Sequence, residues 1–229
     1  MDLTTLRQRL VALGHQPGAE GTPFAAADRA AIAAALTDGP DYALGDHDVE
    51  DAADQLKVEP AAIWAVWDIE GCSSPFIDGR PTILFEPHRF SRATGHRYDA
   101  SHPAVSSLKW NRALYPARQA DRWKQLLDAV ALDIDAGFAS ASYGGFQILG
   151  ENFALCGATS SWSFAWQQAQ TEADQLAAFL KFVEARGLAD ALRRRDWATF
   201  ARVYNGTAFR ENHYDTRLAA AFAKRKAKA

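Results

Sequence analysis

The chain of 229 residues is poor in sulfur, with two cysteines and one methionine. Cys72 and Cys156 stand far apart and match no metal-ligand spacing, so a zinc or iron–sulfur site built on cysteines is not expected. In a protein made in the cytoplasm, we expect both thiols to be reduced and buried. A bridge between them stays open if both line the same site.

Long apolar runs are also lacking. No stretch approaches the roughly eighteen residues that a membrane-spanning helix needs, which excludes a span of that kind. The first residues, MDLTTLRQRLVALG, have no basic region leading into an apolar stretch and therefore do not form a secretory signal. We expect synthesis in the cytoplasm, with release to any other compartment by a separate factor.

Motifs that would indicate a cofactor are absent. The sequence has no glycine-rich phosphate loop, no nucleophile elbow, no HExxH segment and no cluster of cysteine and histidine. What remains is carboxylates, aromatic rings and amides, the composition of a sugar-binding cleft. No metal or organic cofactor is expected.

Apolar residues and charge define what is present. Hydrophobic residues make up 48% of the chain, with seven Trp and thirteen Phe, which is ample for a globular core. The net charge of −3 is unevenly distributed. Residues 1–60 carry eleven acidic and four basic groups, a net of −7, and the remainder carries seventeen and twenty-one, a net of +4. This basic excess is too diffuse to indicate nucleic-acid binding.

A carboxylate interrupts the apolar face of one expected helix. In the segment PAAIWAVWDIE, Ile63, Val66, Trp67 and Glu70 follow the spacing of a single helix face. A carboxyl group at the end of an apolar stripe is partly desolvated, which raises its pKa and allows it to donate a proton near neutral pH. The alternative is a glutamate that pairs with an arginine or faces solvent.

The fold is expected to be all-α, with at most one small hairpin near the strand-like stretch at 81–85. We expect an N-terminal helical appendage over 1–45 and a helical main domain with a cleft over 46–229. The expected helices cover 3–13, 28–36, 46–57, 60–70, 87–95, 116–134, 145–155, 172–186, 197–204 and 213–226. The expected N-caps are Asp46 or Asp48, Thr171 and Asp196.

Two further segments combine polar groups with turn residues. In ASYGGFQILG, residues 141–150, two glycines can bring backbone close to a ligand, and Gln147, at the expected start of a helix, offers a donor and an acceptor. In Val203-Tyr204-Asn205-Gly206, a tyrosine at a helix end can present its hydroxyl group to a cleft. Taken singly, each is ordinary turn chemistry.

Taken together and in this order, the acidic helix end, SYGGFQI and YNG resemble the lysozyme-like superfamily, which includes goose-type lysozymes and lytic transglycosylases. IWAVWDIEG followed by FIDGRPTILFEPHRFSRATGHRYD is more specifically similar to the N-acetylmuramidase family of bacteriophage endolysins. The resemblance covers about residues 46–222, and residues 79–90 are its most specific part. The sequence departs from the pattern at residues 71–75, GCSSP, where the family has a Ser-Gly-Gly-rich stretch.

The resemblance implies roles for particular residues. Glu70 takes the place of the catalytic acid. The implied substrate-binding residues are Tyr143, Gly145, Gln147, Tyr204 and Asn205. Asp99 is a further candidate, either for substrate binding or as a second carboxylate, and Asp78 is an alternative.

Glu86 is the secondary catalytic candidate. It lies between the strand-like stretch and Pro87, where the N-terminus of the next helix would favour its charged form. It is therefore the poorer proton donor, but it could orient a water molecule or anchor the cleft.

The implied activity is that of a peptidoglycan hydrolase that cleaves the β-1,4 bond between N-acetylmuramic acid and N-acetylglucosamine. Its partner would be the peptidoglycan glycan strand, and a monomer is expected. Two alternatives stay open: a lytic transglycosylase that leaves 1,6-anhydro ends, and a non-catalytic peptidoglycan-binding module. The expected lack of a signal fits a phage endolysin released from the host cytoplasm to the cell wall, and it also fits an effector delivered by a secretion machine.

The two ends of the chain could add binding surface. The basic C-terminus could contact anionic envelope polymers or lipid through Lys224, Arg225, Lys226 and Lys228, although a solvated helix end is the simpler interpretation. The first forty residues faintly resemble a peptidoglycan-binding module, but their acidic balance favours an appendage that packs on the main domain.

Overall fold

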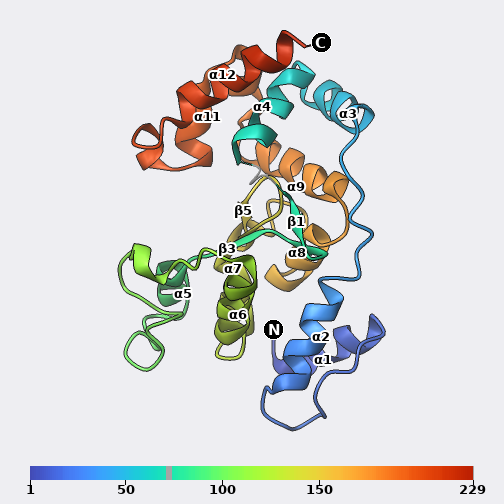
Figure 1. Ribbon diagram of the computed structural model, residues 1–229, viewed down its shortest axis with the longest axis vertical. Helices are drawn as coiled ribbons and strands as arrows, with labels where there is room; N and C mark the ends of the chain where they lie inside the picture. Colours follow the sequence, from blue (N-terminus) through green and yellow to red (C-terminus); the bar gives the residue numbers. More distant parts are fainter. Residues whose placement is uncertain (71–73, 229) are drawn as a thin grey trace.

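The computed structural model describes residues 1–70 and 74–228. Helices dominate, with two small sheets among them (Figure 1), so the expected predominantly helical fold is confirmed. The α-helices are α1 (Leu3–Ala12), α2 (Ala26–Ala35), α3 (Asp46–Leu56), α4 (Pro60–Glu70), α5 (Pro87–Ala93), α6 (Gln119–Val130), α7 (Ile134–Ala139), α8 (Ser161–Gln168), α9 (Glu172–Ala185), α10 (Ala189–Arg194), α11 (Trp197–Tyr204) and α12 (Tyr214–Lys226). The 3-10 turns are η1 (Arg112–Leu114), η2 (Gly150–Asn152) and η3 (Thr207–Arg210). No helix in these described ranges is long and apolar enough to cross a membrane.

Five short strands form a hairpin and a three-stranded sheet, more strand than the single hairpin expected. They are β1 (Phe76–Ile77), β2 (Arg80–Pro81), β3 (Ile83–Phe85), β4 (Ala141–Tyr143) and β5 (Ile148–Leu149). β1 pairs with β2, and β4 lies between β3 and β5, all antiparallel. The hairpin turns at Asp78 and Gly79, whose positive φ angles of 53° and 70° suit a two-residue turn of the Asp-Gly type.

The packing of α12 against α4 holds the C-terminal end of α4 in position. The two helices lie side by side at one end of the molecule (Figure 1), and α3 packs on α4 as well. Val66 is fully buried in α4. From α12, the Arg225 Nε donates to Asp68 Oδ2 at 2.7 Å, and the guanidinium lies 4.6 Å from the centre of the Trp64 ring. These contacts position Glu70, the last residue of α4.

An aromatic cluster joins α4, the turn between β4 and β5, α9 and α11. Phe146 stacks on Phe179 with ring centres 4.3 Å apart, and Trp67 meets Phe146 edge-on at 4.9 Å. Tyr204 approaches Phe179 edge-on at 6.0 Å. Aromatic pairs of this kind each contribute about 1 kcal/mol beyond the area they bury. The cluster therefore holds four distant segments of the chain in one arrangement.

A buried ion pair organises the two N-terminal helices. Asp28 of α2 is fully buried, and its two oxygens accept from Arg7 Nε at 2.7 Å and Arg7 Nη2 at 2.8 Å. The same guanidinium donates to the carbonyl oxygens of Ala19 and Thr22, at 2.6 and 3.0 Å. Since every group of the pair is hydrogen-bonded, the loop between α1 and α2 is tied to both helices.

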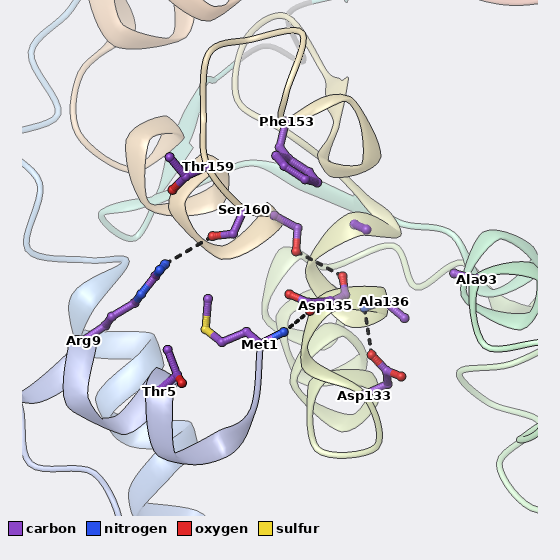
Figure 2. Close-up of a pocket in the computed structure, with 12 residues that line it drawn as sticks. Met1, Thr5, Arg9, Ala93, Asp133, Asp135, Ala136, Phe153, Thr159 and Ser160 are labelled. Atoms are coloured by element: carbon purple, nitrogen blue, oxygen red, sulfur yellow. Dashed lines mark hydrogen bonds and ion pairs between the residues drawn. The ribbon is translucent and has the colours of Figure 1, made fainter.

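The N-terminal helices meet the rest of the chain across a cavity lined by both polar and apolar residues. The cavity has a volume of about 690 Å³ and separates α1 from α7 and α8. Across it, the α-amino group of Met1 pairs with Asp135, and Arg9 Nη1 donates to Ser160 Oγ at 3.3 Å (Figure 2). The segment between α2 and α3 then runs along the start of α9 (Figure 1). There, Leu44 N donates to Glu172 Oε2 at 2.8 Å.

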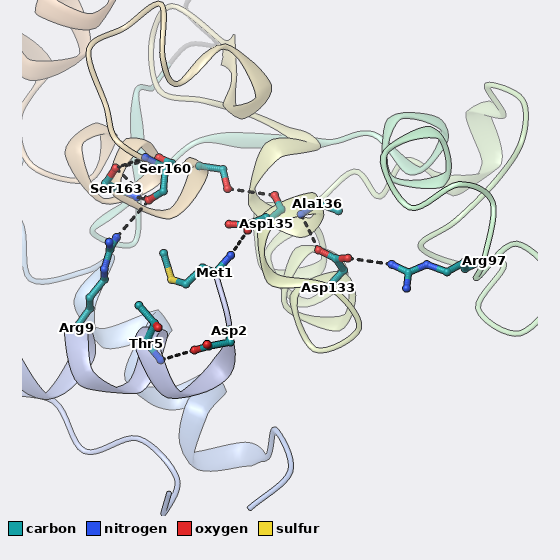
Figure 3. Close-up of polar contacts among 11 residues, drawn as sticks. Met1, Asp2, Thr5, Arg9, Arg97, Asp133, Asp135, Ala136, Ser160 and Ser163 are labelled. Carbon is teal, nitrogen blue, oxygen red and sulfur yellow. Dashed lines mark hydrogen bonds and ion pairs between the residues drawn. The ribbon is translucent and has the colours of Figure 1, made fainter. Parts of the chain in front are cut away.

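Two helix assignments from sequence were wrong. The helix expected over 116–134 is shorter, because α6 ends at Val130 and a separate helix, α7, begins at Ile134. Asp133 caps α7 by accepting from Ala136 N at 3.0 Å, and it also pairs with Arg97 at 3.1 Å (Figure 3), so a new helix begins there. The helix expected over 145–155 is instead β5 and η2. In addition, α8 and α10 were not expected.

The helix caps were predicted in part. Thr171 caps α9 and Asp196 caps α11, as expected. The expectation for α3 was wrong, because Gly45 is its N-cap residue. Asp46 and Asp48 both lie within α3, and Asp48 Oδ2 accepts from Gly45 N at 2.9 Å. The sequence therefore predicted the region of the α3 cap but not the residue that forms it.

Of the two cysteines, only Cys156 lies among the described residues. Cys156 is buried, and burial raises the pKa of its thiol to about 12. Cys72 lies outside the described residues, and so does the bridge considered between them.

Replacing Asp28 by Asn should destabilise the protein, because it leaves the Arg7 charge buried without its counter-charge. We expect the melting temperature at pH 7 to fall by roughly 10 °C. The control is Asp38→Asn, at a side chain that is 65% exposed. Thermal unfolding followed by circular dichroism is the measurement.

The difference should depend on pH. The Arg7 guanidinium lowers the pKa of Asp28 below its ordinary value of 3.8, so the stabilisation is present above that value and is lost as the pH falls through the lowered one. Equal melting temperatures for the two variants at pH 7 would contradict the structural importance of the pair.

Candidate active site

Two of the expected carboxylates line one cleft. The cleft has a volume of about 640 Å³. Glu70 closes it at the end of α4, and Glu86 lies in the segment between β3 and α5. The remaining walls come from β4 to η2, the end of α9, the end of α11 and the start of α12. Segments distant in sequence therefore meet around these two acids.

Glu70 has the environment of a proton donor. Burial raises the pKa of its carboxyl group from an ordinary value of 4.5 to about 7, while a hydrogen bond from Asn205 and the charge of Arg217 oppose that rise. Part of Glu70 remains accessible from the cleft. A carboxyl group with this pKa is substantially protonated at neutral pH and can give up its proton.

Asn205 contacts the acid directly. Its Nδ2 donates to Glu70 Oε1 at 2.7 Å, while its own Oδ1 is buried and has no hydrogen-bond partner among the described residues. Tyr204, next to it, donates to the carbonyl oxygen of Phe146 at 2.7 Å and stacks on Phe200 at 5.2 Å. The end of α11 is thus held in place by Tyr204, and it presents an amide to the acid.

Glu86 has a different environment, rich in partners. It is the N-cap residue of α5, as its position before Pro87 suggested. Its Oε2 lies 3.3 Å from His88 Nε2 and 3.3 Å from Arg89 Nε, and Arg89 also pairs with Glu151. His88 Nδ1 is in turn 3.2 Å from the hydroxyl group of Tyr115. The carboxylate therefore has a cation beside it and a chain of polar groups behind it.

Gln147 lines the cleft but lies in a turn, not at the start of a helix. Its φ of 48° places it in the left-handed region between β4 and β5. Its Oε1 accepts from Ser142 Oγ at 2.8 Å, and its Nε2 donates to the carbonyl oxygens of Thr82 and Gly144 at 3.1 and 2.8 Å. The side chain thus fixes the loop that forms the cleft wall.

Gly145 is required by close packing behind that wall. Its N–H donates to Gln175 Oε1 at 2.6 Å, and a Cβ at this position would lie 2.3 Å from an atom of the Trp67 ring. It does not line the cleft. Only glycine allows the loop to lie this close to the Trp67 ring.

Other expected site residues also lie elsewhere. Tyr143 is fully buried and donates to the carbonyl oxygen of Phe138 at 2.8 Å. Asp99 accepts hydrogen bonds from Ser91 and Ser106 and does not line the cleft. Asp78 occupies the turn between β1 and β2. The structure therefore brings Glu70, Glu86, Gln147, Tyr204 and Asn205 together and leaves these others apart.

Charged residues missed from the sequence also line the cleft. Arg89 and Glu151 form an ion pair on one wall, and Arg186 Nη2 donates to Asn152 Oδ1 at 3.1 Å on another. Arg217 lines the cleft from the first turns of α12. Glu151 directly follows the ASYGGFQILG segment, and that position was the one available signal for it.

The titration of Glu70 should depend on Asn205. Removing the hydrogen bond with Asn205→Ala should raise the pKa of Glu70 above its value of about 7, since that bond favours the charged form. The measurement is a pH titration of carboxyl-labelled glutamate by NMR, assigned with Glu70→Gln. Asn152→Ala, a change on another cleft wall, is the matched control. An unchanged Glu70 pKa in Asn205→Ala would contradict the contact.

Comparisons with known proteins agree with this arrangement. The N-acetylmuramidase family model matches residues 59–226. Over its full length, the chain is similar to a structure described as the crystal structure of a Burkholderia AP3 phage endolysin, with 31% identity, a TM-score of 0.74, and coverage of 100% of this chain and 96% of the other. A search of curated proteins finds no match. The family match spans every residue that lines the cleft, Glu70 and Glu86 included, and the chain therefore belongs to the N-acetylmuramidase family, a family of glycoside hydrolases that act on peptidoglycan.

Proposed function

We propose that the protein hydrolyses the β-1,4 bond between N-acetylmuramic acid and N-acetylglucosamine, with Glu70 as general acid. Glycoside cleavage needs a proton on the leaving oxygen. A pKa of about 7 allows Glu70 to carry that proton at neutral pH. This single observation, a protonatable carboxyl group at the wall of a cleft, carries the proposal.

Asn205 would orient the acid. Because Nδ2 of Asn205 donates to Oε1 of Glu70, the proton of the neutral acid belongs on Oε2. Once the proton has moved to the glycosidic oxygen, the same hydrogen bond stabilises the carboxylate that remains. The bond therefore directs the proton before the transfer and supports the charge after it.

Glu86 is proposed as the second group, which activates the attacking water. It lines the same cleft, and the guanidinium of Arg89 supplies a counter-charge for its ionised form. Gln147 is proposed to shape the sugar site by holding the loop between β4 and β5 in its strained turn. The proton donor and the proposed base thus have different surroundings, one dry and one ion-paired.

Beyond the chemistry, we propose a phage endolysin that degrades the host cell wall during lysis. The similarity to the Burkholderia AP3 phage endolysin supports this role. Residues 1–45 are proposed as an appendage that adds contacts to the cell wall. The buried ion pair between Arg7 and Asp28 stabilises it. Arg225 pairs with Asp68 of α4, and Lys226 pairs with Glu59, the residue before α4. Contact of the basic C-terminus with the envelope would therefore depend on Lys224 and Lys228.

Replacing Glu70 by Gln should lower the rate of peptidoglycan digestion by about 100-fold or more, because the general acid is lost. Glu86→Gln should also lower the rate if it activates water. Release of soluble fragments from purified peptidoglycan is the measurement, with Glu50→Gln on the exposed face of α3 as control. Digestion by Glu70→Gln at the wild-type rate would remove Glu70 from the mechanism.

Product analysis should identify hydrolysis. When water is the acceptor, digestion in ¹⁸O-labelled water places the label at the new reducing end, and mass spectrometry detects it. A transglycosylase would instead use the 6-hydroxyl group of the muramoyl residue and release unlabelled 1,6-anhydro products. Products of the second kind would overturn the hydrolase assignment.

A further inference from the structure

Two cations that line the cleft, Arg186 and Arg217, have no carboxylate partner among the described residues, and of the two only Arg186 donates a side-chain hydrogen bond to another residue. The charged side chains that line the cleft, apart from Glu70, are Asp68, Glu86, Arg89, Glu151, Arg186 and Arg217. Asp68 pairs with Arg225 of α12. Arg89 pairs with the carboxylates of Glu86 and Glu151. Arg186 donates to a side-chain oxygen from η2 and lies over the ring of Phe182 at 5.5 Å.

Arg217 has no carboxylate within ion-pair distance among residues 1–70 and 74–228. It is exposed, and its guanidinium carbon lies 5.2 Å from the centre of the Tyr214 ring, one turn earlier in α12. The ring restricts the side chain without using its N–H groups. A cation held in this way at the wall of a substrate cleft is arranged to receive an anion.

Peptidoglycan supplies such anions beside the bond that is cleaved. The muramic acid carries a lactyl group, which ends either in a free carboxylate or in a stem peptide with its own carboxylates. A guanidinium group binds a carboxylate through two parallel hydrogen bonds. The proposed function, on which this inference rests, brings the muramic acid into the cleft that Arg217 lines.

We propose that Arg217 binds a carboxylate of the muramic acid or its stem peptide, and that this contact promotes protonation of Glu70 when substrate binds. In the free enzyme, the positive charge of Arg217 lowers the pKa of Glu70 and opposes the effect of burial. A bound carboxylate neutralises that charge, so Glu70 takes up a proton from solvent more readily. Substrates without a carboxylate would not have this effect.

Other groups near Glu70 do not supply the same switch. Asn205 is uncharged, and Tyr204 is kept neutral because burial raises its pKa well above the ordinary value. On α4, Asp68 is neutralised by Arg225. Glu86, on the β3–α5 segment, pairs with Arg89, and Arg186, on α9, donates to Asn152. Of the cleft cations, Arg217 is the one whose charge acts on Glu70, so it is the one whose neutralisation by a substrate carboxylate would favour protonation of that acid.

The test compares three soluble peptidoglycan fragments. Intact fragments carry stem-peptide carboxylates, amidase-treated strands carry only lactyl carboxylates, and carbodiimide-amidated fragments carry neither. With Arg217→Gln, we expect KM to rise about tenfold on whichever fragment supplies the carboxylate, with a smaller change in kcat. On amidated fragments, the wild type and Arg217→Gln should be equal. The first two substrates distinguish the lactyl group from the peptide.

Two further variants separate a specific contact from general charge attraction. Arg217→Lys keeps the charge but cannot make the two parallel hydrogen bonds, so it should recover only part of the affinity. Arg202→Gln, on an exposed arginine of α11 outside the cleft lining, should behave as wild type. Equal losses for Arg202→Gln and Arg217→Gln would overturn the proposal. So would the same Arg217→Gln effect on amidated fragments as on those with carboxylates.

The pH profile reports the coupling to the acid. The alkaline limb of kcat/KM should move to higher pH in Arg217→Gln. In the wild type, the alkaline limb of kcat should lie above that of kcat/KM with carboxylate-bearing fragments but not with amidated ones. Coincident limbs on every fragment would overturn the coupling.

Calorimetric binding keeps this result separate from the assignment of Glu70. The same fragments are titrated into the Glu70→Gln variant with and without Arg217→Gln. A weaker binding of carboxylate-bearing fragments to the double variant supports the contact even if Glu70 is not the acid, and equal binding overturns it.

Discussion

The packing of α12 against α4 is the contact on which the cleft depends. It places the end of α4 beside the end of α11 and the start of α12, so an acid, an amide and a cation from distant parts of the chain surround one small volume. The ion pair between Arg225 and Asp68, with Trp64 beneath the guanidinium, closes the outer part of this helix pair. The basic C-terminal helix therefore serves the architecture of the site.

Glu70 and Glu86, two of the acids that line the cleft, have contrasting surroundings. Glu70 ends an apolar helix and has an amide and a distant cation as its polar neighbours. Glu86 begins a helix, and His88 and Arg89 contact the same oxygen of its carboxylate. Burial favours the neutral form of Glu70, whereas Glu86 lies in an ion pair with Arg89. The difference follows from which helix end each residue occupies.

Features with local causes could be predicted from the sequence. The apolar spacing before Glu70 gave α4 its bounds, and Thr171 and Asp196 cap their helices through neighbouring N–H groups. The Asp78-Gly79 pair forms the turn that its residues favour. In each case, the residues that make the structure lie within one or two turns of each other.

Features that depend on distant pairing could not be predicted in this way. The ladder from β3 through β4 to β5 draws the SYGGFQI segment into a sheet and forces Gln147 into a left-handed turn. Adjacent residues of a strand face opposite sides, so Ser142 lines the cleft while Tyr143 enters the core. Arg217 belongs to the site because α12 packs on α4, and no spacing near Glu70 indicates that.

The buried carboxyl group of Glu70 also links folding to proton uptake. Its pKa of about 7 in the folded chain lies above the ordinary value of 4.5, so the native state binds this proton more tightly than the unfolded state does. Its contribution to the free energy of unfolding is complete below about pH 4.5 and is lost as the pH rises through about 7. The pH dependence of the free energy of unfolding therefore reports the titration of Glu70 in the absence of substrate.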